Sequence, residues 1–161
     1  AVAVLLTDGS FGSKRRRLLG AAHEAAPEHH GLCTWGMDKR LPGAPSEYMS
    51  TDAVSVLEHG VALGKRTWDS FLTRLSWSPA AVDKAICHQV GSSHKDVILK
   101  TLGLGGDKDF STYSYLGNIG TVSLPLPAAL AEEREFLAPG HRVAFLGIGS
   151  GLNCLMLGWE W

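Results

Sequence analysis

The stretch KAICHQVGSSHKDVILKTLG, residues 84–103, contains the strand and the helix from which the rest of the fold can be worked out. Its first part is short and apolar, which predicts a buried central strand over Lys84–His88. A hydroxyl of Ser92 or Ser93 can then cap a helix that ends near Gly103, because serine oxygens accept the free N–H groups of a first helical turn. A strand that passes directly into a helix is a typical unit of α/β proteins.

Upstream of this unit, the pattern predicts two further strands and one long loop. Ala1–Leu6 is apolar enough for a buried strand, and Leu18–Ala26 predicts a second strand, because Pro27 argues against its continuing as a helix. The glycines and prolines of Trp35–Tyr48 predict a loop that is long enough to have a binding role.

A long helix is predicted after this loop. Thr51 and Asp52 offer N-cap oxygens for a helix that runs to about Leu75. Gly60 and Gly64 lie one turn apart inside it, although each glycine costs roughly 1 kcal/mol relative to alanine. The pair therefore predicts a close contact that larger side chains would block. The apolar positions recur mostly three or four residues apart, and they are Val54, Leu57, Val61, Trp68, Phe71, Leu72 and Leu75.

Downstream of residue 103, strands and helices continue to alternate. A loop over Gly103–Asp109 leads to a predicted strand over Phe110–Ser114, and a helix is predicted from about Val122 to Phe136. Pro125 and Pro127 fit that helix only in its first turn, where the missing N–H groups have no helical partner. The last predicted elements are two strands, His141–Ile148 and Asn153–Trp161, joined by a tight loop at Gly149–Gly151. The alternation indicates the α/β class.

Composition narrows the class of protein. With 161 residues, 45% of them hydrophobic, the chain can form one domain with a real core, and its net charge of −1 argues against a general nucleic-acid binder. Cys33, Cys87 and Cys154 are odd in number and widely spaced, as expected for reduced thiols of a cytosolic protein. We expect Cys87 and Cys154 to be buried in strands, with Cys87 on the opposite face of its strand from His88. The sequence has no apolar run long enough for a membrane span and no signal peptide. It begins without Met in a strand-like run, so we expect it to start inside a larger protein.

Two polar clusters have weaker functional interpretations. Lys14–Arg17 predicts a solvated loop or strand entry, with contact to an acidic carrier protein or a nucleotide phosphate as the alternative. His29, His30 and Cys33 could ligate a metal, but the second ligand pair of a zinc site is missing, so no metal site is expected. Cys33 is predicted in a loop and could be reactive, although nothing near it in the sequence would lower its pKa.

Three other positions could carry chemistry. His88 ends a strand, where α/β folds present side chains to a ligand crevice. Asn118 is flanked by glycines that permit positive φ and close backbone approach. The loop at Gly149 and Ser150 would let a backbone amide point outward as an oxyanion donor. Taken singly, each has a plainer interpretation, such as a hydrogen-bonded structural histidine or a turn asparagine.

Taken together and in this order, three motifs resemble the C-terminal half of thiolase-superfamily condensing enzymes of the β-ketoacyl synthase III type. The motifs are His88-Gln89, then Gly117-Asn118 with Ser123-Leu124-Pro125 close behind, then Gly149-Ser150-Gly151. Within that family, Gly-Asn-Ile-Gly and Gly-Ile-Gly-Ser-Gly-Leu-Asn-Cys are most similar to the acyl-CoA condensing enzymes of long-chain olefin biosynthesis, the OleA type. The resemblance covers nearly the whole chain.

The resemblance implies a thiolase-like half-domain over residues 1–161, a mixed sheet with helices packed on it and paired with a similar N-terminal half. It implies a Claisen condensation, in which an acyl group on a cysteine is attacked by a second acyl thioester. His88 Nε2 and the Asn118 amide would bind the enolate oxygen. The backbone at Ser150, with Gly149 beside it, would bind the oxygen of the tetrahedral intermediate.

The resemblance also implies partners, and this sequence departs from the family's pattern at some positions. Substrates would be acyl-CoA or acyl-carrier-protein thioesters, with no bound cofactor, in a cytoplasmic homodimer. The nucleophilic cysteine and the glutamate base would lie in the N-terminal half. The segment Gly91-Ser92-Ser93-His94-Lys95 lacks the arginine that fatty-acid initiation enzymes carry there, which favours coenzyme A over a carrier protein. Pro127, in the helix that follows Asn118, is a proline additional to the family's pattern.

Two other functions stay open at this point. The chain could be a non-catalytic thiolase-fold scaffold or partner subunit, although the retained His88, Asn118 and glycine loop argue against that. It could also belong to a related acyltransferase that forms an ester or amide bond. Such enzymes often change the asparagine, which is present here.

Overall fold

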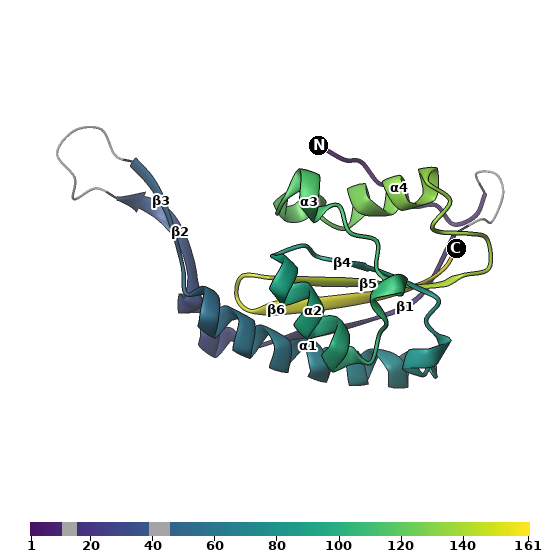
Figure 1. The fold of residues 1–161 in the computed structure, drawn as a ribbon, viewed down its shortest axis with the longest axis horizontal. Coiled ribbons are helices and arrows are strands. Elements are labelled where there is room, and N and C mark those ends of the chain that lie inside the picture. Colours follow the sequence, from purple (N-terminus) through teal and green to yellow (C-terminus); the bar gives the residue numbers. More distant parts are fainter. Residues whose placement is uncertain (11–15, 39–45) are drawn as a thin grey trace.

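A computed structural model of the chain describes residues 1–10, 16–38 and 46–161. Its centre is a four-stranded sheet in the order β1 (Arg17–Ala25), β6 (Asn153–Glu160), β5 (Arg142–Gly149) and β4 (Lys84–Cys87). β4 runs parallel to β5, whereas β1 and β5 both run antiparallel to β6 (Figure 1). The sheet is therefore mixed, and the predicted α/β class is confirmed.

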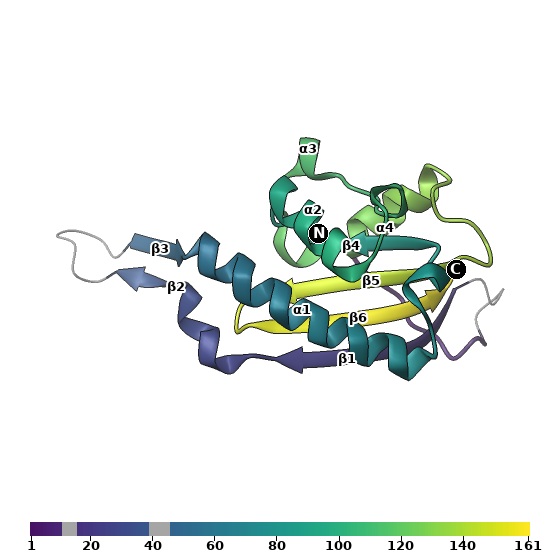
Figure 2. The same ribbon diagram turned by 60° about the horizontal axis from the view of Figure 1, so that its bottom comes forward.

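Helices cover both faces of this sheet. α1 (Ala53–Leu75) and α2 (Ser92–Leu102) pack on one face, and α4 (Pro125–Glu133) packs on the other (Figures 1 and 2). The two faces follow the two-residue alternation of a strand. In β4, Ala85 belongs to the core beneath α1 and α2, and its neighbour Ile86 belongs to the core beneath α4.

The long helix α1 was predicted almost to the residue. The Asp52 carboxylate caps it by accepting the Ser55 N–H at 3.0 Å, and the helix ends where Ser76 takes a left-handed conformation with φ 54°. Trp68 of the predicted apolar stripe is buried, whereas Val54 is 78% exposed. The stripe fails at Val54 because the buried part of α1 begins only at Gly60.

The close contact predicted at Gly60 and Gly64 is confirmed. A methyl group on Gly60 would lie 3.2 Å from Ile148 Cδ1 on β5, and one on Gly64 would lie 3.1 Å from Ile98 Cδ1 on α2. Both distances are shorter than an ordinary van der Waals contact. The two glycines therefore bring α1 close to the sheet and to α2.

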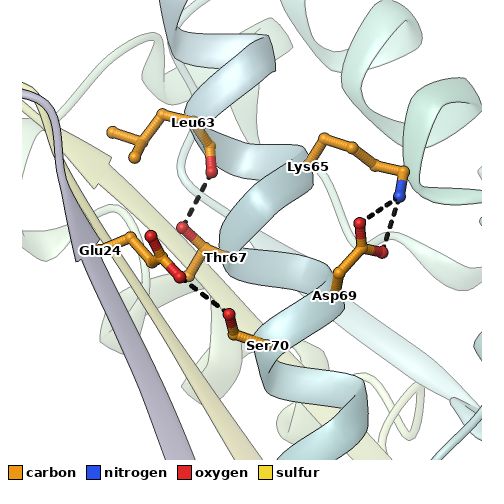
Figure 3. Close-up of polar contacts among 6 residues, drawn as sticks. All are labelled: Glu24, Leu63, Lys65, Thr67, Asp69 and Ser70. Carbon is orange, nitrogen blue, oxygen red and sulfur yellow. Dashed lines mark hydrogen bonds and ion pairs between the residues drawn. The ribbon is translucent and has the colours of Figure 1, made fainter.

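Polar contacts also fasten α1 to the sheet edge. The Ser70 hydroxyl of α1 donates to Glu24 Oε1 of β1 at 2.8 Å (Figure 3). One turn earlier, the buried Thr67 hydroxyl donates to the Leu63 carbonyl at 2.9 Å. Thr67 thus satisfies its only side-chain donor within the helix, as a buried hydroxyl must.

Two predictions around α2 and α3 are wrong. α2 begins at Ser92, so extended Gly91 occupies the N-cap position in place of a serine, and it offers no side-chain cap. No strand forms over Phe110–Ser114: Asp109 makes a single parallel bridge to Ala85, and the chain then turns into α3 (Tyr113–Leu116). The local apolar pattern predicts a strand there, but among the described residues of this segment Asp109 alone pairs with a neighbouring strand, β4.

The prolines of α4 lie where the sequence requires them. A short 3₁₀ helix, η4 (Gly120–Val122), precedes α4, and Pro125 and Pro127 fall in the first turn of α4. The helix is shorter than predicted and ends at Glu133. It stops there because Glu135 takes a left-handed conformation, with φ 59°.

The loop predicted over Trp35–Tyr48 is partly wrong. β2 (Cys33–Asp38) and β3 (Ser46–Thr51) pair as an antiparallel hairpin that projects from the body of the molecule (Figure 1). A short 3₁₀ helix, η1 (Pro27–Leu32), leads into it. Pro42, Gly43 and Pro45, which favoured a loop, fall outside the described residues.

The buried strand predicted over Ala1–Leu6 is also wrong. These residues are exposed and pair with no strand in the described part of the chain. A strand needs a neighbour for its N–H and C=O groups, and apolar pattern alone does not supply one. Among the helices of residues 1–10, 16–38 and 46–161, none combines the length and the apolar character needed to cross a membrane.

A substitution tests how closely α1 approaches the sheet. A methyl group on Gly158 of β6 would overlap the Leu75 side chain and lie 3.2 Å from the Phe71 ring. We expect Gly158→Ala to lower the free energy of unfolding by about 1–3 kcal/mol, because overpacking displaces both side chains. Urea unfolding followed by circular dichroism measures the change.

The matched control is Gly106→Ala, where a methyl group would meet nothing within 4 Å. It should change the unfolding free energy by less than about 0.5 kcal/mol. Equal effects of the two substitutions would contradict the close packing of α1 on β6.

Candidate active site

A cavity of about 270 Å³ brings the predicted site residues together. His88, Asn118, Gly149 and Ser150 all line it, although they come from three separate segments of the chain. The rest of its wall comes mainly from α1, α2 and the facing side of β5 and β6, and is largely apolar. Its apolar side chains include Val56, Leu57, Val61, Ile98, Ile148 and Met156.

His88 follows the last residue of β4. Its N–H donates to the Leu146 carbonyl of β5 at 2.9 Å, which fixes the backbone just beyond the strand. Burial lowers the pKa of His88 from its ordinary value of 6.5, so the imidazole is held neutral at neutral pH. Cys87 also lines the cavity, so the prediction that it faces away from His88 is wrong. The strand alternation ends with β4 at Cys87.

Asn118 is presented by the turn that its flanking glycines predicted. Gly117 and Gly120 have φ 65° and 61°, a region that L side chains rarely adopt. Asn118 Oδ1 accepts the Gly120 N–H at 3.0 Å. Because its oxygen is used within the turn, the amide NH₂ is the group left to donate into the cavity.

The glycine loop joins β5 to β6 at the rim of the cavity. Asn153 Nδ2 donates to the Ser150 carbonyl at 3.0 Å, which fixes the orientation of the peptide after Ser150. Gly149 pairs with Asn153 as the last residues of the hairpin strands. Both Gly149 and Ser150 are exposed, so the loop is open to a ligand at the rim.

Cys33 is a cavity residue whose surroundings the sequence interpretation missed. It starts β2 instead of lying in a loop, and its thiol lies 3.5 Å from the Thr51 hydroxyl. Hydrogen bonds from the side chain of Ser150 and then from Thr51 lower the pKa of Cys33. Ser150 and Thr51 are far from Cys33 in sequence, so no local pattern could have indicated them.

His94 and Lys95 of α2 were also missed as cavity residues. Both residues lie in the first turns of α2. They reach the cavity because of how α2 packs against α1, which the local sequence pattern does not contain. Lys95 Nζ lies 3.8 Å from Asp109 Oδ2, and the Asp109 carboxyl is almost fully buried. Burial raises the pKa of Asp109 above its ordinary value, and Cys87 and Lys95 oppose that shift.

The remaining sequence candidates lie outside the cavity or in the core. The described part of the basic run, Arg16 and Arg17, forms ion pairs with Glu132 and Glu160, so it acts as a strand entry. His29 stacks on His59 with ring centroids 3.7 Å apart. Within the described ranges, no three His, Cys, Asp or Glu side chains are grouped as metal ligands. The predicted burial is confirmed for the two strand cysteines, Cys87 and Cys154.

Two known proteins are similar in sequence to this chain over its whole length. An acyl-CoA:acyl-CoA alkyltransferase of Shewanella oneidensis is 52% identical, and the match covers 100% of this chain and 47% of the relative. An acyl-CoA:acyl-CoA alkyltransferase of Xanthomonas campestris is 30% identical, with 100% and 45% covered. The chain therefore spans about half the length of these relatives.

Solved structures share the fold. Xanthomonas campestris OleA with bound lauric acid and lauroyl-CoA superimposes with a TM-score of 0.80 at 32% identity, over 91% of this chain and 41% of OleA. The 3-oxoacyl-(acyl carrier protein) synthase III FabH of Xanthomonas oryzae gives 0.79 at 31% identity, over 91% and 40%. The mixed sheet with its helices is thus a thiolase-like half-domain.

The family model described as 3-oxoacyl-[acyl-carrier-protein (ACP)] synthase III C terminal matches residues 72–161. That range includes β4, α2, the Asn118 turn and the β5–β6 loop, and therefore His88, Asn118, Gly149 and Ser150. The chain belongs to the family of 3-oxoacyl-[acyl-carrier-protein] synthase III C-terminal domains, and its relatives include OleA-type acyl-CoA condensing enzymes.

Proposed function

We propose that this chain is the C-terminal catalytic half of an acyl-thioester condensing enzyme of the OleA type. The observation that carries the proposal is the meeting of His88, Asn118 and the Gly149–Ser150 loop on one apolar cavity. An enolate needs donors that are fixed in place before charge develops, in surroundings of low polarity. Two observations support the proposal: hydrogen bonds fix the backbone at His88 and the turn at Asn118, and the cavity wall is largely apolar.

Each polar group has a distinct role. His88 Nε2 and the Asn118 amide donate to the thioester oxygen of the attacking substrate as it becomes an enolate. The backbone N–H of Ser150, beside Gly149, donates to the oxygen of the tetrahedral intermediate at the rim. Each donor aimed at developing charge in this way lowers the activation free energy by about 3–4 kcal/mol.

A neutral His88 suits this role. Burial lowers its pKa, so the imidazole carries one proton at neutral pH and can donate it as a hydrogen bond without giving it up. A charged imidazolium would instead tend to protonate the enolate and end the reaction.

Acyl-CoA thioesters are the proposed substrates. The apolar side chains of α1 and α2 in the cavity wall suit an alkyl chain, and related proteins are named for reactions between two acyl-CoA molecules. The segment Gly91–Lys95 lacks the arginine that the resemblance to initiation enzymes leads one to expect a few residues after the histidine. The proposal therefore favours coenzyme A over a carrier protein, and no bound cofactor is required.

The rest of the proposed enzyme lies outside this chain. A nucleophilic cysteine and a glutamate base would come from an N-terminal half, in a homodimer, and the isolated half would release no coenzyme A above background. The proposed enzyme is cytoplasmic and belongs to lipid metabolism. The free thiols of Cys33, Cys87 and Cys154 support the proposed compartment.

Substitution of the two donors tests their roles in the full-length protein. We expect His88→Ala and Asn118→Ala each to lower the rate of condensation by about 10²–10³-fold, since each removes one donor to the enolate. Acyl loading on the nucleophilic cysteine should stay at least partly intact. Release of coenzyme A measures loading, and mass spectrometry of the product measures condensation.

His23→Ala is the matched control, because His23 is exposed on β1 and lies outside the cavity. It should leave both steps unchanged. Condensation that survived both His88→Ala and Asn118→Ala would contradict the assigned roles.

The protonation of His88 gives a second prediction. Its folded-state pKa should lie below 6.5, so the neutral form, and with it condensation, should persist as pH falls through 6.5. A proton NMR titration of the His88 ring measures the midpoint. A His88 midpoint above 6.5 would show that burial does not control its charge.

A further inference from the structure

The segment 109–112 holds the end of β4 on the side away from β5. Phe110 N–H donates to the Ala85 carbonyl at 3.3 Å, beyond the last strand of the sheet. On the other side, His88 N–H donates to the Leu146 carbonyl of β5 at 2.9 Å. The backbone that carries His88 is therefore fastened from both sides.

Two side chains of this region contact the residues directly before and after His88. Asp109 Oδ1 accepts the Cys87 N–H at 3.3 Å. Gln89 Oε1 accepts both the Thr112 N–H at 3.0 Å and the Thr112 hydroxyl at 3.2 Å. Gln89 is 6% exposed, Asp109 8% and Thr112 0%, so water does not compete for these hydrogen bonds.

Burial of the Asp109 carboxyl at this position costs free energy. Its Oδ2 accepts no hydrogen bond within the described residues, and Lys95 Nζ lies 3.8 Å from it. A buried, incompletely paired carboxylate often stabilises a protein less than an apolar side chain of the same size would. Its presence is better explained by the Cys87 N–H that it holds.

The same segment leads directly to Asn118. The Thr112 carbonyl accepts the Leu116 N–H at 2.9 Å, and the Tyr113 carbonyl accepts the Gly117 N–H at 2.9 Å. Gly117 is the residue before Asn118. Backbone hydrogen bonds therefore connect the Gln89–Thr112 contact to the turn that presents Asn118.

We propose that Asp109, Gln89 and Thr112 form a positioning clamp that fixes His88 relative to Asn118 for the condensation step. The inference rests on the proposed function of the two donors. None of the three clamp residues is among the described residues that line the cavity, so they act through His88 and Asn118 and do not touch substrate. Donors to one oxygen must be held to within about 0.5 Å, which isolated loop residues rarely achieve.

Gln89→Met in the full-length protein tests the clamp. Methionine keeps the volume but removes the acceptor, which frees the Thr112 segment from the end of β4. We expect kcat for condensation to fall about 10–10²-fold, the loss that small misplacements of reacting groups cause. The KM for acyl-CoA and the rate of acyl loading should be unchanged, because loading uses the cysteine of the other half.

Asp109→Ala and Asp109→Asn form a matched pair. Alanine removes the acceptor for the Cys87 N–H and should lower condensation, whereas asparagine keeps an Oδ1 acceptor and should restore most of the rate. An equal loss of condensation rate in Asp109→Ala and Asp109→Asn would overturn the role of Asp109. If Gln89→Met does not fold, Thr112→Val is measured in its place. It removes the hydroxyl donor and keeps the Thr112 N–H donor to Gln89 Oε1, so kcat for condensation should fall by a smaller factor, with KM and acyl loading again unchanged.

Combination with His88→Ala separates positioning from general stability. A residue that acts partly through His88 costs less once His88 is gone, so Gln89→Met should lower condensation by a smaller factor in the His88→Ala background than in the unsubstituted enzyme. A multiplicative further loss, or an equal loss of loading and condensation, would overturn the clamp. Condensation unaffected by His88→Ala itself would instead refute the proposed function.

Discussion

The hydrogen bond from His88 N–H to the Leu146 carbonyl extends the parallel pairing of β4 and β5 one residue beyond the strand, and the rest of the site depends on that pairing. Parallel strands end at the same edge of a sheet, so the side chain after β4 and the loop after β5 open onto one cavity. With β4 antiparallel to β5, His88 and Ser150 would lie at opposite edges. The register that pairs Cys87 with Leu146 is therefore the constraint that makes a shared site possible.

The packing of α1 gives that site its apolar character. Gly60 and Gly64 let the helix approach β5 and α2, and the cavity lies where these elements meet. Burial of His88 lowers its pKa and keeps it neutral. Fold and chemistry are linked here by desolvation, because the packing of α1 helps to enclose the apolar cavity that His88 lines.

The sequence predicted those parts that depend on local pattern. The cap at Asp52, the apolar period of α1, the positive φ at Gly117 and Gly120, and the prolines in the first turn of α4 are all properties of neighbouring residues. The order of the three motifs also identified His88, Asn118 and the Ser150 loop as candidates. Their meeting at one cavity followed from the resemblance and not from any single motif.

The remaining features depend on contacts between distant segments. Ala1–Leu6 has the pattern of a strand but no described partner strand, and the β2–β3 hairpin forms because two segments of weak pattern pair with each other. Lys95 reaches the cavity, and Asp109 reaches the end of β4, only after α2 and the following segment fold back on the sheet. No periodicity or spacing contains that information.

Product analysis of the full-length protein tests the central claim most directly. The protein is incubated with a long-chain acyl-CoA alone, and then with added malonyl thioester, and the acyl products are identified by mass spectrometry. Carbon–carbon bond formation at the proposed site predicts a β-keto acid built from two acyl units. An ester or amide of the acyl group, or only free fatty acid and coenzyme A under both conditions, would contradict the account.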